Sequence, residues 1–588
     1  MPSDRHSSRA AVSAMVPYLL ARYVPISRWL PGYARTSLRP DLVAALTSWG
    51  VMVPVALAYA GLAGVPPELG LVTAFAAMAA YAVFGTSRHL KVTVSSTMAI
   101  MSATVVADLA RGDPGSYVAY TSALALIVGV MLVAGGLAKL GFVSDFLTKS
   151  VVTGFIIGVA ITIIVGQLPK VLGVPRLTGS FPEQVVQLVS RIPDTNPYTC
   201  TVGLSALVLI LVLRRFARRV PGSLIALVLG IVAVTAFGLE AHGVSVVGEV
   251  ATGLPAPSIP SVPLQALPYL VLGAVGIVFL AVGESVGTGR SYGATHGYEI
   301  DPDQEMIALG SANLGAGLLG GFTADASLSQ TATAEAAGAT TQLSSLVTSG
   351  LVLATAVFLA PLFQNLPDAV LGAIVIAASL GLINVEEMRR YWRWRRTDFL
   401  IAVTAMVGVL LTTVLAGMVL AVLLSVLFLL YRASRPYVAV LGRMAGRAST
   451  FGDLSRHPDA AAIPRLVIVR LDAPLYFFNA NVAKAQILEI AAREVPPPHG
   501  VLIDLAATAD LDVTTTDMLF DLVRELRVRS VEVMLAQVKG TVRDRLRKTG
   551  LMDEIGEDRV FRSIPGAVND FQRRWPPGED AAPGAPTG

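Results

Sequence analysis

Long apolar runs without charged side chains constrain this sequence more than any other feature. The segment LIAVTAMVGVLLTTVLAGMVLAVLLSVLFLLY (400–431) contains no acidic or basic residue, and LSALVLILVL (204–213) is a second such run. Only 15% of the 588 residues are charged, whereas a water-soluble chain devotes about a quarter of its residues to charge. Because such surface is stable mainly against lipid, the sequence predicts a polytopic α-helical protein of the lipid bilayer.

Apolar stretches between Gly, Pro and charged residues predict about fourteen membrane spans. The third and tenth of these are the shortest, and both are rich in Ser and Thr. Several are shorter than the ~20 residues that a straight helix needs to cross a bilayer. The predicted spans are approximately 41–60, 66–84, 94–108, 117–138, 146–168, 198–213, 222–239, 268–289, 303–320, 326–338, 343–364, 367–384, 398–415 and 417–433.

The placement of Lys and Arg predicts the orientation of the chain. If residue 41 starts at the cytoplasmic side, alternate crossings place sixteen of the basic residues between 41 and 435 inside and four outside. Cytoplasmic loops normally carry this excess of positive charge, and an odd number of spans would have scrambled it. We therefore predict a multi-pass protein of the cytoplasmic membrane with both termini in the cytoplasm.

The C-terminal quarter of the chain has a different pattern of apolar and polar residues. RLVIVRL, LYFFNA, GVLIDLA and VEVMLA are typical of short buried strands, with amphipathic helices near 481–493, 514–529 and 541–549. Alternating strands and helices predict a small cytoplasmic α/β domain. The predicted division of the chain is a cytoplasmic segment 1–37, a transmembrane domain 38–434, a linker and domain start 435–463, the α/β domain 464–574 and a disordered tail 575–588.

Two short spans contain the polar residues most typical of a ligand site. In KVTVSSTMAIMSA (91–103) an alternating stretch leads into a helix that starts near Ser95, Ser96 and Thr97. In GGFTADASLSQTATAEAAG (320–338) a Gly-rich break leads into a second Ser/Thr-rich helix. Interrupted spans at matching positions, third and tenth, indicate two halves of seven spans related as an inverted repeat, with the ligand between them.

The N-terminal ends of two such helices would favour an anion as the ligand. Each end presents free backbone N–H groups and the positive end of the helix dipole, and hydroxyl groups add further donors. The alternative is that Ser and Thr only allow close packing of helices. We favour the binding site, because both segments are short and follow extended or Gly-rich chain.

Glu284 lies in the otherwise apolar span VFLAVGESVGTGRSYG, with Thr288 one helical turn later. A carboxylate at this depth could carry a proton, or bind sodium together with Thr288. The alternative is an interfacial glutamate near the cytoplasmic end of the span, paired with Arg290. We favour the functional role.

Other features point away from enzyme or nucleic-acid chemistry. Cys200 is the single cysteine, and His89 and His296 are isolated in the sequence without the neighbours of a zinc site. We find no nucleophile–base constellation, so we predict no cofactor and no enzymatic activity. The Gly-rich stretch GSANLGAGLLGG (310–321) lacks the context and Lys of a phosphate loop and is typical of close helix packing. The net charge of +4 lies mostly at span ends, so no nucleic-acid partner is expected.

Several motifs together resemble the sulfate permease (SulP) family, which includes bicarbonate transporters and prestin. They are PVALAYAGLAGVPPELGL (54–71), FGTSRHLKV (84–92), KSVVTGFIIGVAITIIVGQLPKVLG (149–173) and GGFTADASLSQTA (320–332). The C-terminal domain resembles the STAS domain (sulfate transporter and anti-sigma-factor antagonist), notably DLDVTTTDMLFDL (510–522). The resemblance is collinear from about residue 38 to 572.

The resemblance implies fourteen spans in a seven-plus-seven inverted repeat, a core domain that moves against a gate domain, and usually a homodimer. It implies an anion site between spans three and ten. The matching positions of this chain predict substrate contacts at Tyr59, Ser95, Ser96, Ser327, Leu328 and Ser329. Glu284 and Thr288 match the acidic and hydroxyl pair that binds sodium in a bicarbonate-transporting branch.

The chain departs from the family pattern at three places. Val55 stands where the family usually has Gln or Glu, and Gln330 where many members have Arg. The substrate and the coupling ion of this chain therefore cannot be inferred from any single branch of the family. In the STAS domain Val513 follows Asp512, where soluble relatives have a phosphorylated Ser, so we interpret Asp512 as the cap of a helix beginning at 513.

These observations predict secondary active transport of a small inorganic anion by alternating access, sulfate first and bicarbonate second, coupled to protons or sodium. One alternative is a membrane anion sensor that signals through the STAS domain to a cytoplasmic protein partner. Another is a dicarboxylate or chloride transporter of the same family. A nucleobase carrier is disfavoured, because that group lacks a STAS domain.

Overall fold

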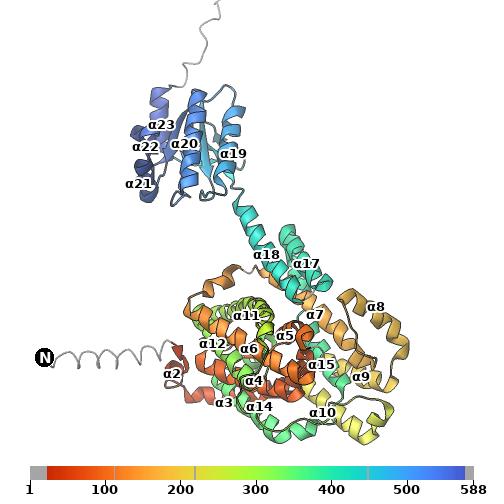
Figure 1. Cartoon of the computed structure of the whole chain (residues 1–588). Coiled ribbons are helices and arrows are strands. Elements are labelled where there is room, and N and C mark those ends of the chain that lie inside the picture. Colours follow the sequence, from red (N-terminus) through yellow and green to blue (C-terminus); the bar gives the residue numbers. More distant parts are fainter. Residues whose placement is uncertain are drawn as a thin grey trace, which may run out of the picture. The chain divides into compact units, whose positions relative to one another are not determined.

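The computed structural model describes residues 23–110, 113–146, 148–217, 220–412, 414–446 and 449–576. Its internal contacts divide the chain into two compact units, Met1–Ser425 and Val426–Gly588. The beginning of the predicted N-terminal segment, up to residue 22, and the predicted tail from residue 577 lie outside the described residues. Figure 1 shows the chain coloured along its sequence.

Helices occupy all fourteen predicted spans. Eight of the described helices, some extended by flanking turns, are long and apolar enough to cross a membrane by length and composition. In chain order the helices of the spans are α3 (Leu38–Ala63), α4 (Pro67–Phe84), α5 (Ser96–Ala110), α6 (Pro114–Leu137), α7 (Lys149–Leu172), α9 (Pro197–Phe216), α10 (Gly222–Phe237), α11 (Leu267–His296), α12 (Pro302–Leu318), α13 (Leu328–Ala336), α14 (Leu343–Ala354), α15 (Asp368–Leu380), α17 (Arg396–Leu411) and α18 (Val414–Ala433).

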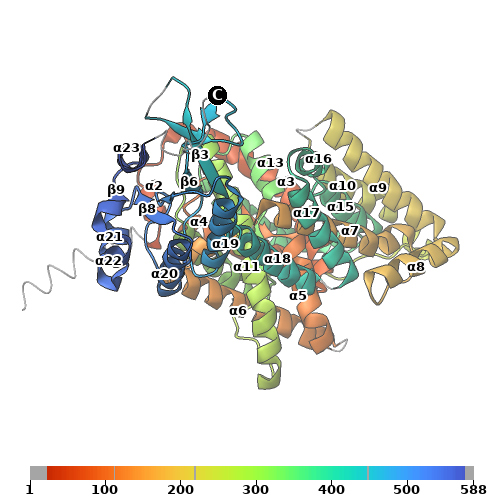
Figure 2. The same cartoon turned by 90° about the horizontal axis from the view of Figure 1, so that it is seen from above.

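Among the described residues of the first unit, three further α-helices lie outside the spans: α2 (Ile26–Trp29), α8 (Phe181–Arg191) and α16 (Val385–Trp394). Within the first unit, α7, α9, α10 and α15 lie together in both views (Figures 1 and 2). A second group brings α3, α4 and α14 together, and α12 packs against both α4 and α6. Of these helices, α3 packs against both α5 and α13, and α6 packs against α5.

Glycines allow α12 to approach α6 closely, as the Gly-rich stretch predicted. A Cβ atom added to Gly310 would lie 2.7 Å from the carbonyl oxygen of Gly129, and one added to Gly317 would lie 2.9 Å from that of Ser122. Side chains larger than hydrogen would therefore force the helices apart. Close backbone approach through small residues is how helices associate where lipid supplies no hydrophobic driving force.

The second unit is an α/β domain with one mixed sheet. The strands are ordered β4-β3-β6-β7-β8-β9, with β5 paired to β3, and the four strands from β6 to β9 are parallel. Their bounds are β3 (Val438–Met444), β4 (Phe451–Asp453), β5 (Ala460–Ala461), β6 (Leu466–Leu471), β7 (Gly500–Asp504), β8 (Glu532–Ala536) and β9 (Val560–Phe561). Three of these strands lie within 435–463, the range predicted as the linker and the start of the domain.

Alternate residues of the strands enter two separate cores. Val467 and Val469 of β6 pack with α19 (Ala480–Arg493), α20 (Val513–Val528), α21 (Gly540–Thr549) and α22 (Leu551–Ile555) on one face of the sheet. Leu466 and Ile468 pack with α23 (Ile564–Arg574) on the other. Both faces are therefore covered, which is why strands β6 to β8 are almost continuously apolar.

One predicted strand of this domain is wrong. LYFFNA (475–480) forms a turn that leads into α19. The side chain of Asn479 accepts a hydrogen bond from the backbone N–H of Tyr476 (2.8 Å) and donates to the carbonyl oxygen of Pro474 (3.0 Å). These local bonds outweigh the strand preference of the aromatic residues. By contrast, Asp512 caps α20 as predicted, because its carboxylate accepts from the N–H of Thr515 (2.7 Å).

Candidate functional site

The third and tenth spans meet through a two-stranded antiparallel sheet. Strand β1 (Val92–Val94) pairs with β2 (Ala324–Ala326) so that Thr93 lies opposite Asp325. Each strand leads directly into a short helix, β1 into α5 and β2 into α13. Because the strands are antiparallel, with Val94 opposite Ala324 and Ala326 opposite Val92, α5 and α13 start at opposite ends of the strand pair. The interrupted parts of the third and tenth spans are therefore in direct contact, as the sequence predicted.

Side chains of the surrounding helices hold β2 in its extended form. The chain breaks after α12 at Gly320, whose φ of +78° favours glycine. Asn313 of α12 then donates to the carbonyl oxygen of Ala324 and accepts from its N–H, both at 2.9 Å. The hydroxyl of Thr73 in α4 accepts from the N–H of Phe322 (3.1 Å). Buried backbone groups outside regular helix are thus satisfied, as a position inside the bilayer demands.

A second set of bonds joins α13 to the chain just before β1. The N–H of Ser327 donates to the carbonyl oxygen of Lys91 (2.8 Å). In return the N–H of Lys91 donates to the hydroxyl of Thr331 in α13 (3.0 Å). The two helix starts therefore form one connected structure rather than two independent segments.

The predicted substrate contacts lie around these helix starts but differ in exposure. On the α5 side, Ser95, Ser96 and Tyr59 are buried, and the hydroxyl of Tyr59 is hydrogen-bonded to Ser96. On the α13 side, Ser327 is partly exposed and Ser329 is exposed. Leu328 is also exposed, with 54% of its surface accessible.

Ser327 is the N-cap of α13, where its hydroxyl accepts from the N–H of Gln330. It also lies 3.3 Å from the hydroxyl of Ser329. Ser96 is the first residue of α5. The arrangement thus presents hydroxyl groups and the first backbone N–H groups of two helices from opposite sides of the strand pair. Such groups can bind an anion without a formal positive charge in direct contact.

The two departures from the family pattern in the transmembrane domain, Val55 and Gln330, are both buried. Val55 lies in α3, one turn before Tyr59, and is 8% exposed. Gln330 is 2% exposed, and its Oε1 atom has no hydrogen-bond partner among the described residues. A buried carbonyl oxygen without a hydrogen-bond partner is costly. The side-chain amide of Gln330 can therefore still accept a hydrogen bond beside the start of α13.

The second predicted site, at Glu284, contains an acidic residue that the sequence interpretation missed. Glu284 lies in α11, and the next residue, Ser285, donates a hydrogen bond from its hydroxyl to Oδ1 of Asp325 in β2. The two carboxylates interact electrostatically. Both Oε2 of Glu284 and Oδ2 of Asp325 are buried without a hydrogen-bond partner among the described residues. Thr288 is half-buried one turn later.

The two buried carboxylates each have an oxygen without a hydrogen-bond partner among the described residues. Like charges close together in a low-dielectric environment favour uptake of a proton or a small cation, which relieves their repulsion. Within the described residues no cluster of three or more His, Cys, Asp and Glu side chains is arranged to hold a metal ion. Asp325 was recognisable in the sequence, since it lies one residue before the predicted tenth span, within the stretch GGFTADASLSQTATAEAAG (320–338) that the sequence indicates as a candidate site.

Lys91 is a second buried charge that the interpretation passed over. It is 1% exposed, and its ammonium group donates to the hydroxyls of Ser344 (2.6 Å) and Ser345 (2.8 Å) at the start of α14. This buried lysine lies one residue before β1. Its ammonium group is hydrogen-bonded to α14, whereas its backbone N–H is bonded to Thr331 of α13.

His89 and His296 are isolated in the sequence but meet in the structure. Their rings stack with centroids 4.1 Å apart, and Nε2 of His296 lies 2.7 Å from Oε1 of Glu335. His89 precedes β1, His296 ends α11 and Glu335 lies near the end of α13. Sequence separation concealed this contact, because the three residues meet only when the two halves of the first unit pack together.

Comparison with known proteins gives consistent results for both units. The model of the sulfate permease family matches residues 38–405, and that of the STAS domain matches residues 457–567. A probable sulfate transporter of Mycobacterium tuberculosis (strain H37Rv) is 36% identical over 552 residues, which cover 93% of this chain and 98% of that protein. The high affinity sulfate transporter 2 of Stylosanthes hamata is 30% identical over 572 residues, covering 93% and 86%.

Solved structures share the fold. The murine anion transporter Slc26a9 in its inward-facing state superposes with a TM-score of 0.86 at 22% identity, covering 95% of each chain. The transmembrane domain of the cyanobacterial bicarbonate transporter BicA gives a TM-score of 0.58 at 24% identity, covering 67% of this chain and 98% of that domain. The family model covers more than half of the chain, and the relatives align along nearly their full length. The chain is therefore a multi-pass anion transporter that belongs to the sulfate permease family, with a STAS domain at its C-terminal end.

Proposed function

We propose that this protein transports sulfate across the cytoplasmic membrane by alternating access, together with a cation that Glu284 and Asp325 share. The observation that carries the proposal is the pairing of β1 with β2, which joins the two strands that lead into α5 and α13. The relatives named as sulfate transporters support sulfate as the anion.

The chemistry of the helix starts suits a small oxyanion. Backbone N–H groups at helix starts stabilise negative charge, and serine and tyrosine hydroxyls donate directionally to oxygen. Tyr59, Ser95 and Ser96 would contact the anion from the α5 side. Ser327, Leu328 and Ser329 would contact it from the α13 side. Since no arginine or lysine side chain is needed in contact with the ion, binding can stay weak enough for release.

Coupling follows from the link between the two sites. Glu284 and Asp325 have buried oxygens without partners, and Asp325 lies in the strand that leads to the α13 contacts. A proton or sodium ion on this pair neutralises negative charge close to the arriving anion. The cation and the anion therefore favour each other's binding, which is the physical requirement of symport.

The test is uptake of radiolabelled sulfate into proteoliposomes with imposed proton or sodium gradients. Accumulation above the equilibrium level with one inward gradient, and competition by unlabelled sulfate over bicarbonate, chloride and dicarboxylates, supports the proposal. Absence of uptake of every anion by folded protein would contradict it and favour an anion sensor acting through the STAS domain.

Two further features belong to the same proposal. The excess of Lys and Arg on alternate loops supports cytoplasmic termini, which would place the STAS domain in the cytoplasm. Assembly as a homodimer remains a prediction from the family resemblance. Cysteine accessibility from each side of the membrane tests the first feature, and mass measurement in detergent tests the second.

A further inference from the structure

A hollow on the STAS domain is lined by basic residues that the transport account does not use. It has a volume of about 480 Å³ and is lined by Gln537, Val538, Lys539, Gly540, Arg543 and Arg562. The lining comes from the carboxyl ends of the parallel strands β8 and β9 and from the start of α21. Ligands of α/β folds commonly bind at this edge of a parallel sheet.

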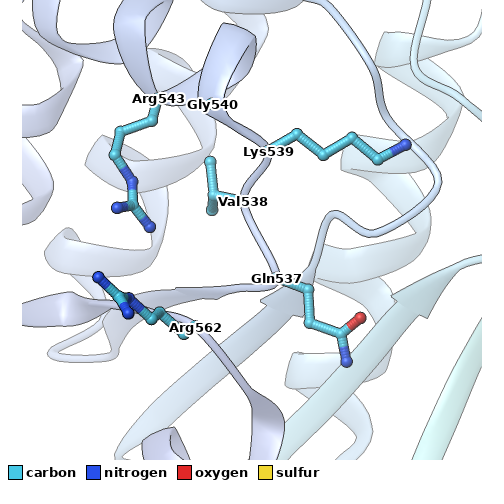
Figure 3. A pocket seen from close by; sticks show the side chains of 6 residues that line it. All are labelled: Gln537, Val538, Lys539, Gly540, Arg543 and Arg562. Atoms are coloured by element: carbon cyan, nitrogen blue, oxygen red, sulfur yellow. The ribbon is translucent and has the colours of Figure 1, made fainter.

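Two arginine side chains face each other across the hollow. Figure 3 shows the guanidinium groups of Arg543 and Arg562 pointing toward one another, whereas the Lys539 side chain extends away from them. Neither group forms an ion pair or a hydrogen bond with the described part of the chain, and Nε of Arg543 is buried without a partner. Arg543 is partly buried and Arg562 is exposed, and an anion between the two guanidinium groups would reduce their mutual repulsion.

Neighbouring carboxylates do not supply that anion. Asp510 is bonded to Arg545 (3.3 Å) and Asp558 to Arg559 (2.9 Å). Asp510 and Asp558 are thus paired with other arginines, and within the described residues no ion pair joins a carboxylate to Arg543 or Arg562.

The backbone adds donors at the same place. Lys539 is the N-cap of α21, and its side chain forms no capping bond. The first N–H groups of a helix have no partner within the helix. A Cβ atom added to Gly540 would meet nothing within 4 Å, so there is open space beside these N–H groups. A ligand can therefore approach the helix start closely.

We propose that this hollow binds a tetrahedral oxyanion, either free sulfate or a phosphate group, between Arg543 and Arg562 and against the first turn of α21. Planar guanidinium groups bind sulfate and phosphate oxygens with paired N–H donors. The site lies within the STAS domain itself, so it is separate from the anion site of the membrane domain and its occupancy does not depend on transport.

Hydrogen–deuterium exchange of the full-length protein in detergent tests the proposal with spatial resolution. Sodium sulfate and sodium phosphate are compared separately with sodium chloride at equal ionic strength, which removes general screening effects. Slower exchange in 537–545 and 560–564 is expected with at least one of the two oxyanions. The salt that slows exchange in these segments identifies whether the ligand is sulfate or a phosphate group. Protection at 92–98 or 324–331 instead would report the transport site alone and would overturn the proposal.

The variants Arg543→Gln and Arg562→Gln should each weaken this protection, with about a tenfold higher half-saturating concentration, because each removes charged hydrogen-bond donors to the oxyanion. Arg529→Gln is the matched control. Arg529 is an exposed arginine at the C-terminal end of α20 and does not line the hollow. Unchanged exchange with both oxyanions, or protection retained in both arginine variants, would contradict the proposal.

Discussion

The hydroxyl of Ser285 donates a hydrogen bond to the carboxylate of Asp325, and it also accepts one from the N–H of Ala326 (3.2 Å). Ser285 follows Glu284 in α11, whereas Asp325 and Ala326 form the strand that leads into α13. The helix with the proposed coupling carboxylate is thus tied directly to the strand that positions the proposed anion contacts. Movement of one is transmitted to the other.

Replacement of Glu284 by glutamine should separate coupling from anion binding. We expect Glu284→Gln to abolish accumulation of sulfate driven by a cation gradient while exchange of sulfate for sulfate continues, because glutamine cannot gain or lose the charge. Proteoliposome uptake and exchange assays measure the two activities. Glu299→Gln, an exposed glutamate beyond the same helix, should accumulate sulfate normally. Gradient-driven accumulation by Glu284→Gln would exclude Glu284 from coupling.

Asp325→Asn tests whether the two carboxylates act as a pair. If they share one cation, Asp325→Asn should lose gradient-driven accumulation as Glu284→Gln does. The double variant should then be no worse than either single one, because effects of groups that act together are not additive. The measurement is the initial uptake rate of all three variants under one gradient. Normal coupling in Asp325→Asn would show that Glu284 acts alone.

Tyr59→Phe should weaken anion binding without affecting coupling. The variant removes one hydroxyl at the start of α5, and we expect about a tenfold rise in KM for sulfate, the change that corresponds to 1.4 kcal/mol. The dependence of uptake on the cation gradient should remain. Tyr120→Phe in α6 removes a hydroxyl outside the proposed site and serves as the control. An unchanged KM would remove Tyr59 from the proposed contacts.

Asp512 should stabilise the STAS domain in a pH-dependent manner. Burial opposes ionisation, but hydrogen bonds from Thr515 and the N–H of Phe477 prevail and lower the pKa of Asp512. Its stabilising effect is therefore present above the unfolded pKa and is lost as pH falls through the lowered folded pKa. Asp512→Ala should destabilise α20 by about 1 kcal/mol at neutral pH, measured as faster amide exchange in 513–528. An unchanged exchange rate at neutral pH would contradict the cap.

Much of this fold could be predicted because its signals are local. Charge-free runs gave the positions of the spans, and the alternating residues before Ser95 predicted a short extended piece that the structure contains as β1. LYFFNA misled because its composition favours a strand, whereas the bonds of Asn479 that form the turn depend on a specific local geometry.

The parts of the candidate site that the sequence did not predict depend on contacts between distant segments. His89 and His296 meet through packing of the two halves. Asp325 gains its neighbour Glu284 only when α11 crosses β2. The two serines that accept hydrogen bonds from Lys91 lie more than 250 residues away in the sequence. No periodicity in one sequence records such pairings. Of these ionisable residues only Glu284 lies inside a predicted span, where a charged residue marks a position of interest.

The most direct test of the account is protection of a single cysteine by sulfate. With Cys200→Ser as the background, Ser329→Cys would place a reactive thiol at the exposed start of α13, and Thr201→Cys would place one at an exposed position of α9 as the control. In a Ser329→Cys variant that still transports sulfate, the account predicts that sulfate slows modification by a small thiol reagent at residue 329 and leaves residue 201 unaffected. An unchanged rate at residue 329 under saturating sulfate would contradict an anion site between α5 and α13.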